Sequence, residues 1–205
     1  MSRYLCVGLA WSVLGVPTAR ADEGAGNFLS LRAGVVLPRD QRRDFGMDFA
    51  IEAAATRQFY PLLQGELAVG YFRTVSGVTD VAPYPDPVTF NAYIPMKQTA
   101  SVVPVTLSAK GVLPGSAFQP FISAGAGIYI VNLEDDPTDP ALATRRDSAS
   151  PFGYHFGLGA TVMLGGNLVA SFEGRYLLLS EATFFRGDQP SLSQIHLTAG
   201  LGYRF

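Results

Sequence analysis

The sequence FGYHFGLGATVML at residues 152–164 alternates between two kinds of side chain with a period of two. Strict alternation predicts a β-strand with two unlike faces, because successive side chains of a strand point to opposite sides. One face is small and polar, and the other is aromatic and aliphatic. The first face carries Gly153, His155, Gly157, Gly159, Thr161 and Met163, and the second carries Phe152, Tyr154, Phe156, Leu158, Ala160, Val162 and Leu164.

Seven further stretches alternate in the same way, which gives eight predicted strands. A membrane-spanning helix is the alternative for residues 148–172, because they contain no Asp, Glu, Lys or Arg. Several glycines interrupt this segment, however, and its apolar residues recur at every second position, so a strand is expected. The other seven predicted strands are 27–37, 45–56, 63–73, 99–111, 120–131, 168–179 and 194–205.

The charged residues of the predicted strands lie opposite the large apolar residues, except for Arg73 at the end of its strand. Four are basic and four are acidic, and their face is also rich in Gly, Ala, Ser and Thr. This composition fits the crowded interior of a transmembrane barrel whose apolar face meets lipid. A soluble β-sandwich with its charged face in water is the alternative. The eight residues are Arg32, Asp48, Glu52, Glu66, Lys110, Glu173, Arg175 and Arg204.

The connections between the predicted strands sort by length. From 57–62 onward short and long connections alternate, and Gly165-Gly166-Asn167 is a tight hairpin signal. Short turns at one end, long loops at the other and both termini at the short-turn end are typical of bacterial outer-membrane barrels. We therefore predict an all-β fold, an eight-stranded antiparallel transmembrane β-barrel within residues 22–205. The long connections are 74–98, 132–151 and 180–193.

Two local features are expected in these strands. Pro104 lies inside the predicted strand 99–111, where it removes a ladder hydrogen bond, so we expect a bulge or a strand end there. Aromatic residues near strand ends on the apolar face predict girdles at the membrane interfaces. These residues are Tyr71, Tyr154, Tyr176, Tyr203 and Phe205.

Residues 1–21 have the features of a cleaved signal peptide. Arg3 gives a positive start, an apolar run over 4–16 follows, and Ala19-Arg20-Ala21 supplies the small-x-small cleavage motif. A membrane anchor is the alternative, but the run is shorter than the roughly 20 residues needed to span a bilayer. The only cysteine, Cys6, lies within this segment, so the mature chain is expected to have no disulfide and no cysteine ligand.

Charge argues against a nucleic-acid partner. The chain has 15 Lys and Arg against 17 Asp and Glu, and the basic residues are scattered rather than clustered. Charged residues make up 16% of the sequence, whereas an average soluble domain has about 25%. The chain is therefore poor in the groups that keep a protein surface solvated.

The C-terminal strand resembles a known signature. Leu197-x-Ala199-x-Leu201-x-Tyr203-x-Phe205 is similar to the terminal strand of bacterial outer-membrane proteins, which implies recognition of Phe205 by the barrel-assembly machinery. The internal strands at 103–107, 120–127 and 172–176 resemble those of the eight-stranded OmpA-like and OmpW-like barrel families. The resemblance covers residues 27–205 and implies location in the cell outer membrane, with both termini periplasmic.

The two histidines, His155 and His196, are the first candidates for a functional site. Both have the parity of the polar face, so we expect them inside the barrel near Glu173 and Arg175. A hydrogen-bonded packing network is the expected role, and a small polar site or proton-sensitive plug is the alternative. Lipid A deacylases, which are also eight-stranded barrels, resemble hydrolases with a Ser-His-Glu set on the lipid-facing wall, and neither histidine here has that parity.

The acidic run Glu134, Asp135, Asp136 and Asp139 is the second candidate site, and we expect a solvated loop there rather than a cation site. The sequence therefore predicts no catalytic, cofactor-binding or metal-binding residue. We expect a monomeric, non-enzymatic protein without a wide pore. Its partners would be outer-membrane lipid and lipopolysaccharide, and its role structural or surface interaction through the three long connections. The alternatives are a narrow OmpW-like channel for small solutes and an outer-membrane lipid-modifying hydrolase.

Overall fold

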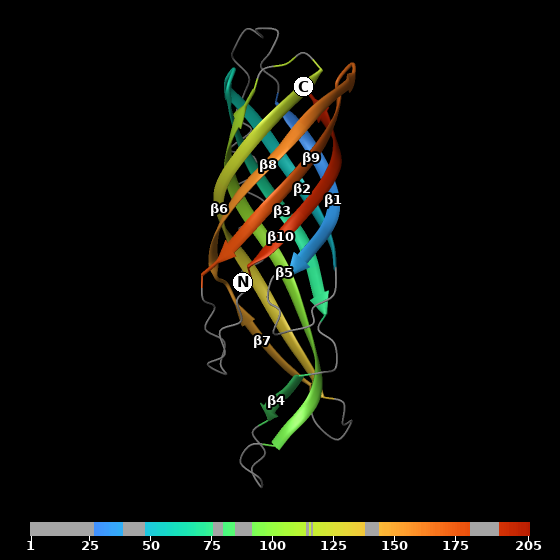
Figure 1. Cartoon of the computed structure of the whole chain (residues 1–205), viewed down its shortest axis with the longest axis vertical. Coiled ribbons are helices and arrows are strands. Elements are labelled where there is room, and N and C mark those ends of the chain that lie inside the picture. Colours follow the sequence, from blue (N-terminus) through green and yellow to red (C-terminus); the bar gives the residue numbers. More distant parts are fainter. Residues whose placement is uncertain are drawn as a thin grey trace, which may run out of the picture.

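The fold is a closed β-barrel with two of its hairpins extended at one end (Figure 1). The computed structural model describes residues 27–38, 48–75, 80–84, 92–113, 115, 117–137, 144–180 and 193–205. The predicted signal peptide lies outside them, as does most of the connection at 180–193. The strands are β1 (Phe28–Pro38), β2 (Asp48–Tyr60), β3 (Leu63–Val75), β4 (Asp80–Tyr84), β5 (Ala92–Val112), β6 (Phe118–Pro137), β7 (Arg145–Ala149), β8 (Phe152–Gly165), β9 (Leu168–Leu179) and β10 (Gln194–Arg204).

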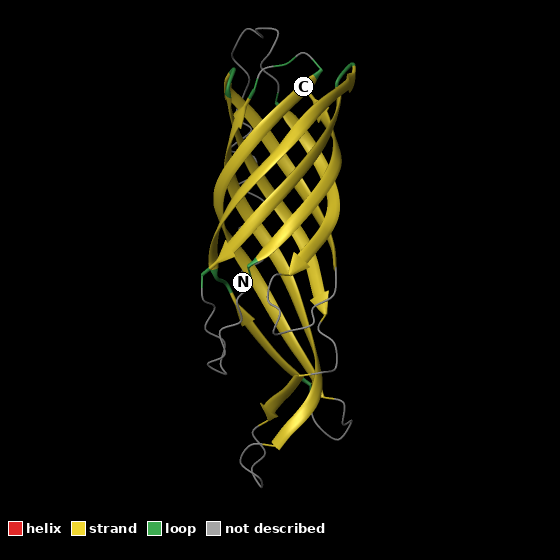
Figure 2. Ribbon diagram, viewed as in Figure 1, coloured by secondary structure: helices red, strands yellow, loops and turns green. Residues whose placement is uncertain are grey.

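Eight of these strands close the barrel, and every pairing between neighbours is antiparallel. The order around the wall is β1, β2, β3, β5, β6, β8, β9 and β10, and β10 returns to β1 through pairs such as Ala33 with Ala199. Figure 2 shows the closed wall of tilted strands. The predicted all-β fold with eight antiparallel barrel strands is confirmed. The described residues contain no helix long and apolar enough to cross a membrane. The strands β7, β8 and β9 occupy most of residues 148–172, so the helical alternative for this segment is wrong.

Side chains alternate between the two faces of the wall as the sequence predicts. The outward Leu158 and Ile122 have exposed fractions of 70% and 71%, whereas the inward Arg32 and Glu66 are 2% and 1% exposed. A soluble sandwich would bury its large apolar residues between two sheets. Here they form the outer surface of a closed barrel, so the sandwich alternative is wrong.

The short turns and the two described chain ends lie at the same end of the barrel. The amide of Phe205 donates to the carbonyl of Asn27 at 2.9 Å, which ties the last residue beside the start of β1. The β8–β9 hairpin turns at the predicted glycine pair. Gly165 has a φ of 117° and Gly166 a φ of 56°, values that L side chains rarely adopt.

The prediction that 74–98 and 132–151 are loops is wrong, because strands occupy much of both segments. β5 begins at Ala92 and β6 continues to Pro137, so both extend well past the rim of the barrel. β4 pairs with the start of β5, and β7 pairs with the end of β6. The four strands form a sheet that projects beyond the barrel, seen at the bottom of Figure 1. This sheet needs no apolar face toward lipid, so the alternation that predicts barrel strands is missing there.

Pro104 occupies neither a bulge nor a strand end, which corrects the expectation for it. The β3–β5 ladder lacks the pairs at Gly70 and Tyr71, yet the register is the same on both sides of this gap. On the other side, Pro104 keeps its place opposite Tyr129 of β6. A Cβ added to Gly70 would lie 3.2 Å from Cγ of Pro104. The small residue opposite the proline therefore lets the ring fit without a change of register.

Candidate functional site

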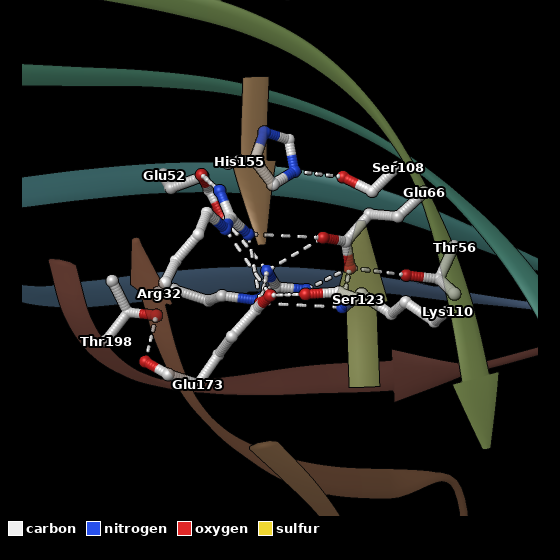
Figure 3. A network of polar contacts seen from close by, with 11 residues as sticks. Arg32, Glu52, Thr56, Glu66, Ser108, Lys110, Ser123, His155, Glu173 and Thr198 are labelled. Atoms are coloured by element: carbon white, nitrogen blue, oxygen red, sulfur yellow. Dashed lines mark hydrogen bonds and ion pairs between the residues drawn. The ribbon is translucent and has the colours of Figure 1, made fainter. Parts of the chain in front are cut away.

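A cluster of six charged side chains fills the middle of the lumen. They belong to five strands, and all six have the inward parity that the sequence predicts. Figure 3 shows five of them with labels, converging from opposite walls. Of the other two predicted charges, Asp48 instead accepts a hydrogen bond from the amide of Val75 at 3.1 Å, and Arg204 lies at the end of β10. The cluster consists of Arg32 of β1, Glu52 of β2, Glu66 of β3, Lys110 of β5, and Glu173 and Arg175 of β9.

Glu66 accepts hydrogen bonds from two cations of this cluster, Arg32 and Lys110. Both terminal nitrogens of Arg32 donate to its carboxylate, one of them at 3.0 Å, and Nζ of Lys110 donates at 2.6 Å. The hydroxyl of Thr56 donates at 3.0 Å. The bidentate contact with Arg32 is the strong, orientationally specific form of an ion pair. Because these donors come from β1, β2 and β5, Glu66 links three other strands to β3.

The other two carboxylates complete the network. Glu173 accepts from Arg175 at 2.9 Å, from Arg32 at 3.1 Å and from the hydroxyl of Ser123 at 2.8 Å. Glu52 accepts from Arg32 and from Arg175, each at 2.9 Å. Three cations therefore balance three carboxylates in a space that water barely reaches. Burying such charges is costly, and it is compensated only when each keeps its partners.

The two histidines lie in the lumen close to Arg175, as predicted. His155 of β8 is fully buried, and its Nε2 lies 2.8 Å from the hydroxyl oxygen of Ser108 on β5. His196 of β10 is opposite Arg175 in the ladder, and its ring meets Phe72 edge-on with centroids 5.0 Å apart. Ser108 was not singled out from the sequence, although its parity within β5 matches that of Lys110. Nδ1 of His155 and Nε2 of His196 are buried without a hydrogen-bond partner among the described residues, so the hydrogen-bonded packing network stays a prediction.

Toward the extended end, an apolar layer covers the charged cluster. Its residues come from the ends of β1, β2, β3 and β9 away from the short turns and from the middle of the longer strands β5 and β6. The sequence analysis missed this layer, and the signal for it is a change from charged to apolar residues on the inward parity. The layer consists of Val36, Ala50, Phe72, Val102, Tyr129, Val131 and Leu177.

Among the described residues no group of three or more acidic or histidine side chains could hold a metal ion. Of the acidic run, Glu134 pairs with Arg146 at 2.9 Å and Asp136 accepts from Thr144 at 3.0 Å. Asp139 lies outside the described residues. Glu134 and Asp136 thus have protein partners on the sheet extension.

Solved structures similar to this chain include bacterial outer-membrane proteins. Neisserial surface protein A is 16% identical and superposes with a TM-score of 0.56, covering 89% of this chain and 100% of its own. A major outer-membrane protein from Thermus thermophilus is 16% identical with a TM-score of 0.59, covering 87% of this chain and 99% of its own. Ail of Yersinia pestis, solved with the heparin analogue sucrose octasulfate, is 12% identical with a TM-score of 0.51, covering 88% and 97%. No protein-family model matches the sequence, and no curated protein matches it. The chain thus has the fold of the bacterial eight-stranded outer-membrane barrels.

Proposed function

We propose that the protein is a sealed, non-enzymatic barrel of the bacterial outer membrane that displays its projecting sheet as a surface for interaction. The observation that carries this proposal is the length of β5 and β6, 21 and 20 residues. A membrane-spanning strand needs only about 9–11 residues. Half of each strand is therefore available outside the bilayer.

The outer surface supports a position in the membrane. Tyr203 and Phe205 are exposed near the short-turn end, and Tyr71 and Tyr154 are exposed toward the other end, as two aromatic girdles require. Tyr176, the fifth residue expected there, is half-buried. We propose that the short-turn end, with both termini, faces the periplasm and that the barrel is monomeric. We propose lipid and lipopolysaccharide as its partners in the outer membrane. The barrel-assembly machinery would recognise β10 through Phe205.

The charge of the projecting sheet bears on the kind of partner. Ail was solved with a heparin analogue, which is a polyanion. Among the described side chains of β7 and the outer parts of β5 and β6, carboxylates outnumber cations. The acidic residues are Glu134, Asp136 and Asp147, and the basic ones are Lys97 and Arg146. A protein partner is therefore proposed here rather than a polyanion.

The other two roles receive less support. A channel requires a continuous path, and the lumen holds a charged layer and an apolar layer in series. A lipid hydrolase requires its nucleophile on the lipid side, whereas Ser108 and His155 meet inside the barrel. These observations favour the non-enzymatic, non-conducting role.

Epitope accessibility on intact cells tests the orientation. An epitope inserted between β6 and β7 should bind antibody on intact cells, and one inserted after Leu62 should bind only after permeabilisation. Outer-membrane fractionation and a heat-dependent shift on a gel verify that both insertions fold. The reverse accessibility would overturn the orientation, and a freely soluble periplasmic protein would overturn the membrane assignment.

Removal of the projecting sheet tests the display role. A variant in which short turns replace residues 76–98 and 132–151 keeps the barrel strands that span the membrane. We expect it to fold with the same heat shift, and cells expressing it to adhere less to surfaces coated with matrix or serum proteins than cells expressing the full chain. Equal adherence by both would contradict the proposed role of the sheet.

A further inference from the structure

A groove of about 560 Å³ runs along the outer face of the barrel near the short-turn end. Its floor is made of two small outward residues, Ala55 and Ala109, and on the strand between them Gly65 leaves room for the ring of Phe59. Because these residues are small, the surface is hollowed where a lipid-facing wall usually carries large side chains. Its apolar walls are formed by Leu29, Phe59, Leu63, Leu67, Leu107 and Phe205.

Arg57 lines the same groove. It lies on the outward parity of β2, one outward position from Ala55, and its side chain is exposed. The predicted strand 45–56 stops one residue before it, so Arg73 is the only outward cation that the sequence analysis names. In the structure β2 continues to Tyr60, which places Arg57 on the surface that faces lipid.

The position of Arg57 is constrained by its neighbours. Its guanidinium carbon is 5.8 Å from the ring centroid of Phe59, within the range of a cation–π contact. The Phe59 ring in turn lies over Gly65, where an added Cβ would be only 2.6 Å from a ring carbon. Within the described part of the chain, Arg57 forms no ion pair. A held cation beside an apolar groove is thus left without a protein anion.

We propose that this groove binds an anionic glycerophospholipid of the leaflet at the short-turn end. One acyl chain lies against Ala55 and Ala109, beside the Phe59 ring that covers Gly65, and the lipid phosphate accepts hydrogen bonds from Arg57. The charges of the two groups are complementary, because the guanidinium of Arg57 is positive and can donate two parallel hydrogen bonds to the negative lipid phosphate. The depth is also suitable, because Arg57 precedes the β2–β3 turn by only a few residues and its side chain can reach the headgroup region.

A second outward groove, of about 660 Å³, shows what distinguishes the first. Its outward residues include Ala33, Ala160 and Leu197, and its one charged lining residue, Glu173, directs its carboxylate into the lumen cluster. It therefore offers apolar surface without an anchoring charge. Arg73 is the opposite case, an exposed outward cation on β3 that lines neither groove.

Native mass spectrometry of the refolded chain in detergent tests the proposal with dioleoyl-phosphatidylglycerol as the probe. We expect one lipid to be retained, and Arg57→Gln to weaken its apparent affinity about tenfold, a change that corresponds to about 1.4 kcal/mol. Arg73→Gln is the matched control and should leave the affinity unchanged. Ala109→Leu fills the floor and should also weaken binding, whereas Ala199→Leu, an outward substitution away from this groove, should not.

A competition experiment distinguishes binding of the lipid phosphate from binding of the acyl chains. Glycerol 3-phosphate has the anion without the chains, and we expect it not to displace the phospholipid. Displacement by glycerol 3-phosphate, or equal losses for Arg57→Gln and Arg73→Gln, would overturn the proposal, since binding would then be an ionic effect without a groove. The heat shift on a gel verifies that every variant is folded before its affinity is measured.

Discussion

Glu66 receives donors from three other strands and is almost inaccessible to water. Glu66→Gln keeps the shape of the side chain but leaves Arg32 and Lys110 with less opposing charge in the lumen. Removing one partner from a buried ion pair costs about 3–5 kcal/mol. We therefore expect a large fall in the urea midpoint of the barrel folded in lipid vesicles.

Glu134→Gln provides the matched control for this prediction. Glu134 pairs with Arg146 on the projecting sheet, where their side chains are 41% and 79% exposed. An exposed pair contributes only about 0–1 kcal/mol. The two variants should thus differ clearly, and similar midpoints for both would show that the lumen cluster does not hold the strands together.

Gly125 shows how closely the lumen is packed around His155. A Cβ at this position would lie 2.4 Å from the carbonyl oxygen of Leu107 and 2.6 Å from Nε2 of His155. Gly125→Ala must therefore displace the imidazole from Ser108 and also shift the backbone of β5. Overpacking of this kind costs about 1–3 kcal/mol, which should lower the temperature at which the folded band is lost on a gel.

Gly111→Ala is the control for Gly125→Ala, because both glycines lie in the neighbouring strands β5 and β6. At Gly111 the nearest atom to an added Cβ is Cγ1 of Ile122 at 3.4 Å, on the outer face. We expect this variant to retain the wild-type transition. Equal transitions for the two variants would mean that the wall adjusts freely around His155.

At the scale of the strands, the β8–β9 turn depends on two glycines with different requirements. The φ of 117° at Gly165 lies outside the left-handed region that other residues visit, whereas the φ of 56° at Gly166 lies inside it. We expect Gly165→Ala to destabilise the barrel by about 1–3 kcal/mol and Gly166→Asn to be nearly neutral. Urea unfolding of both variants checks this, and the reverse ranking would contradict it.

The strands that face lipid on one side could be predicted from the sequence, because lipid imposes the alternation that identifies them. β8 and β9 begin at the predicted residues and end within one residue of the prediction. The outer halves of β5 and β6, with β4 and β7, could not be predicted. They lie beyond the barrel, where lipid imposes no alternation, and their prolines and acidic residues have the composition of loops.

The sequence predicts which charged residues of the candidate site face the lumen. It does not predict how they pair or that an apolar layer lies beside them. Parity alone places Arg32, Glu66 and Glu173 in the lumen, but it does not say which carboxylate meets which cation. Those contacts depend on the stagger between strands, which sets the heights of residues far apart in the sequence. The apolar layer was missed for the same reason, since Val36, Phe72 and Leu177 form one level only after the barrel closes.

At the scale of the whole molecule, we propose that the lumen is sealed twice. The interior of an eight-stranded barrel is just wide enough for side chains to fill it. The six charged side chains form one seal, and the layer around Phe72 and Leu177 forms the other, nearer the projecting sheet. The seals lie in series, so either one alone should stop ions.

Conductance in planar bilayers distinguishes this arrangement from a narrow channel. The wild-type chain should be silent, and so should Phe72→Ala with Leu177→Ala, because the charged layer remains. Glu52→Ala with Arg175→Ala removes a cation and a carboxylate together and should also stay silent behind the apolar layer. Only the protein with all four substitutions should conduct. The heat shift of each protein verifies that it is a folded barrel.

Two outcomes would contradict this arrangement. A conducting wild-type chain would show that neither layer seals the lumen. An apolar-layer variant that conducts as well as the fourfold variant would show that the charged cluster does not seal it.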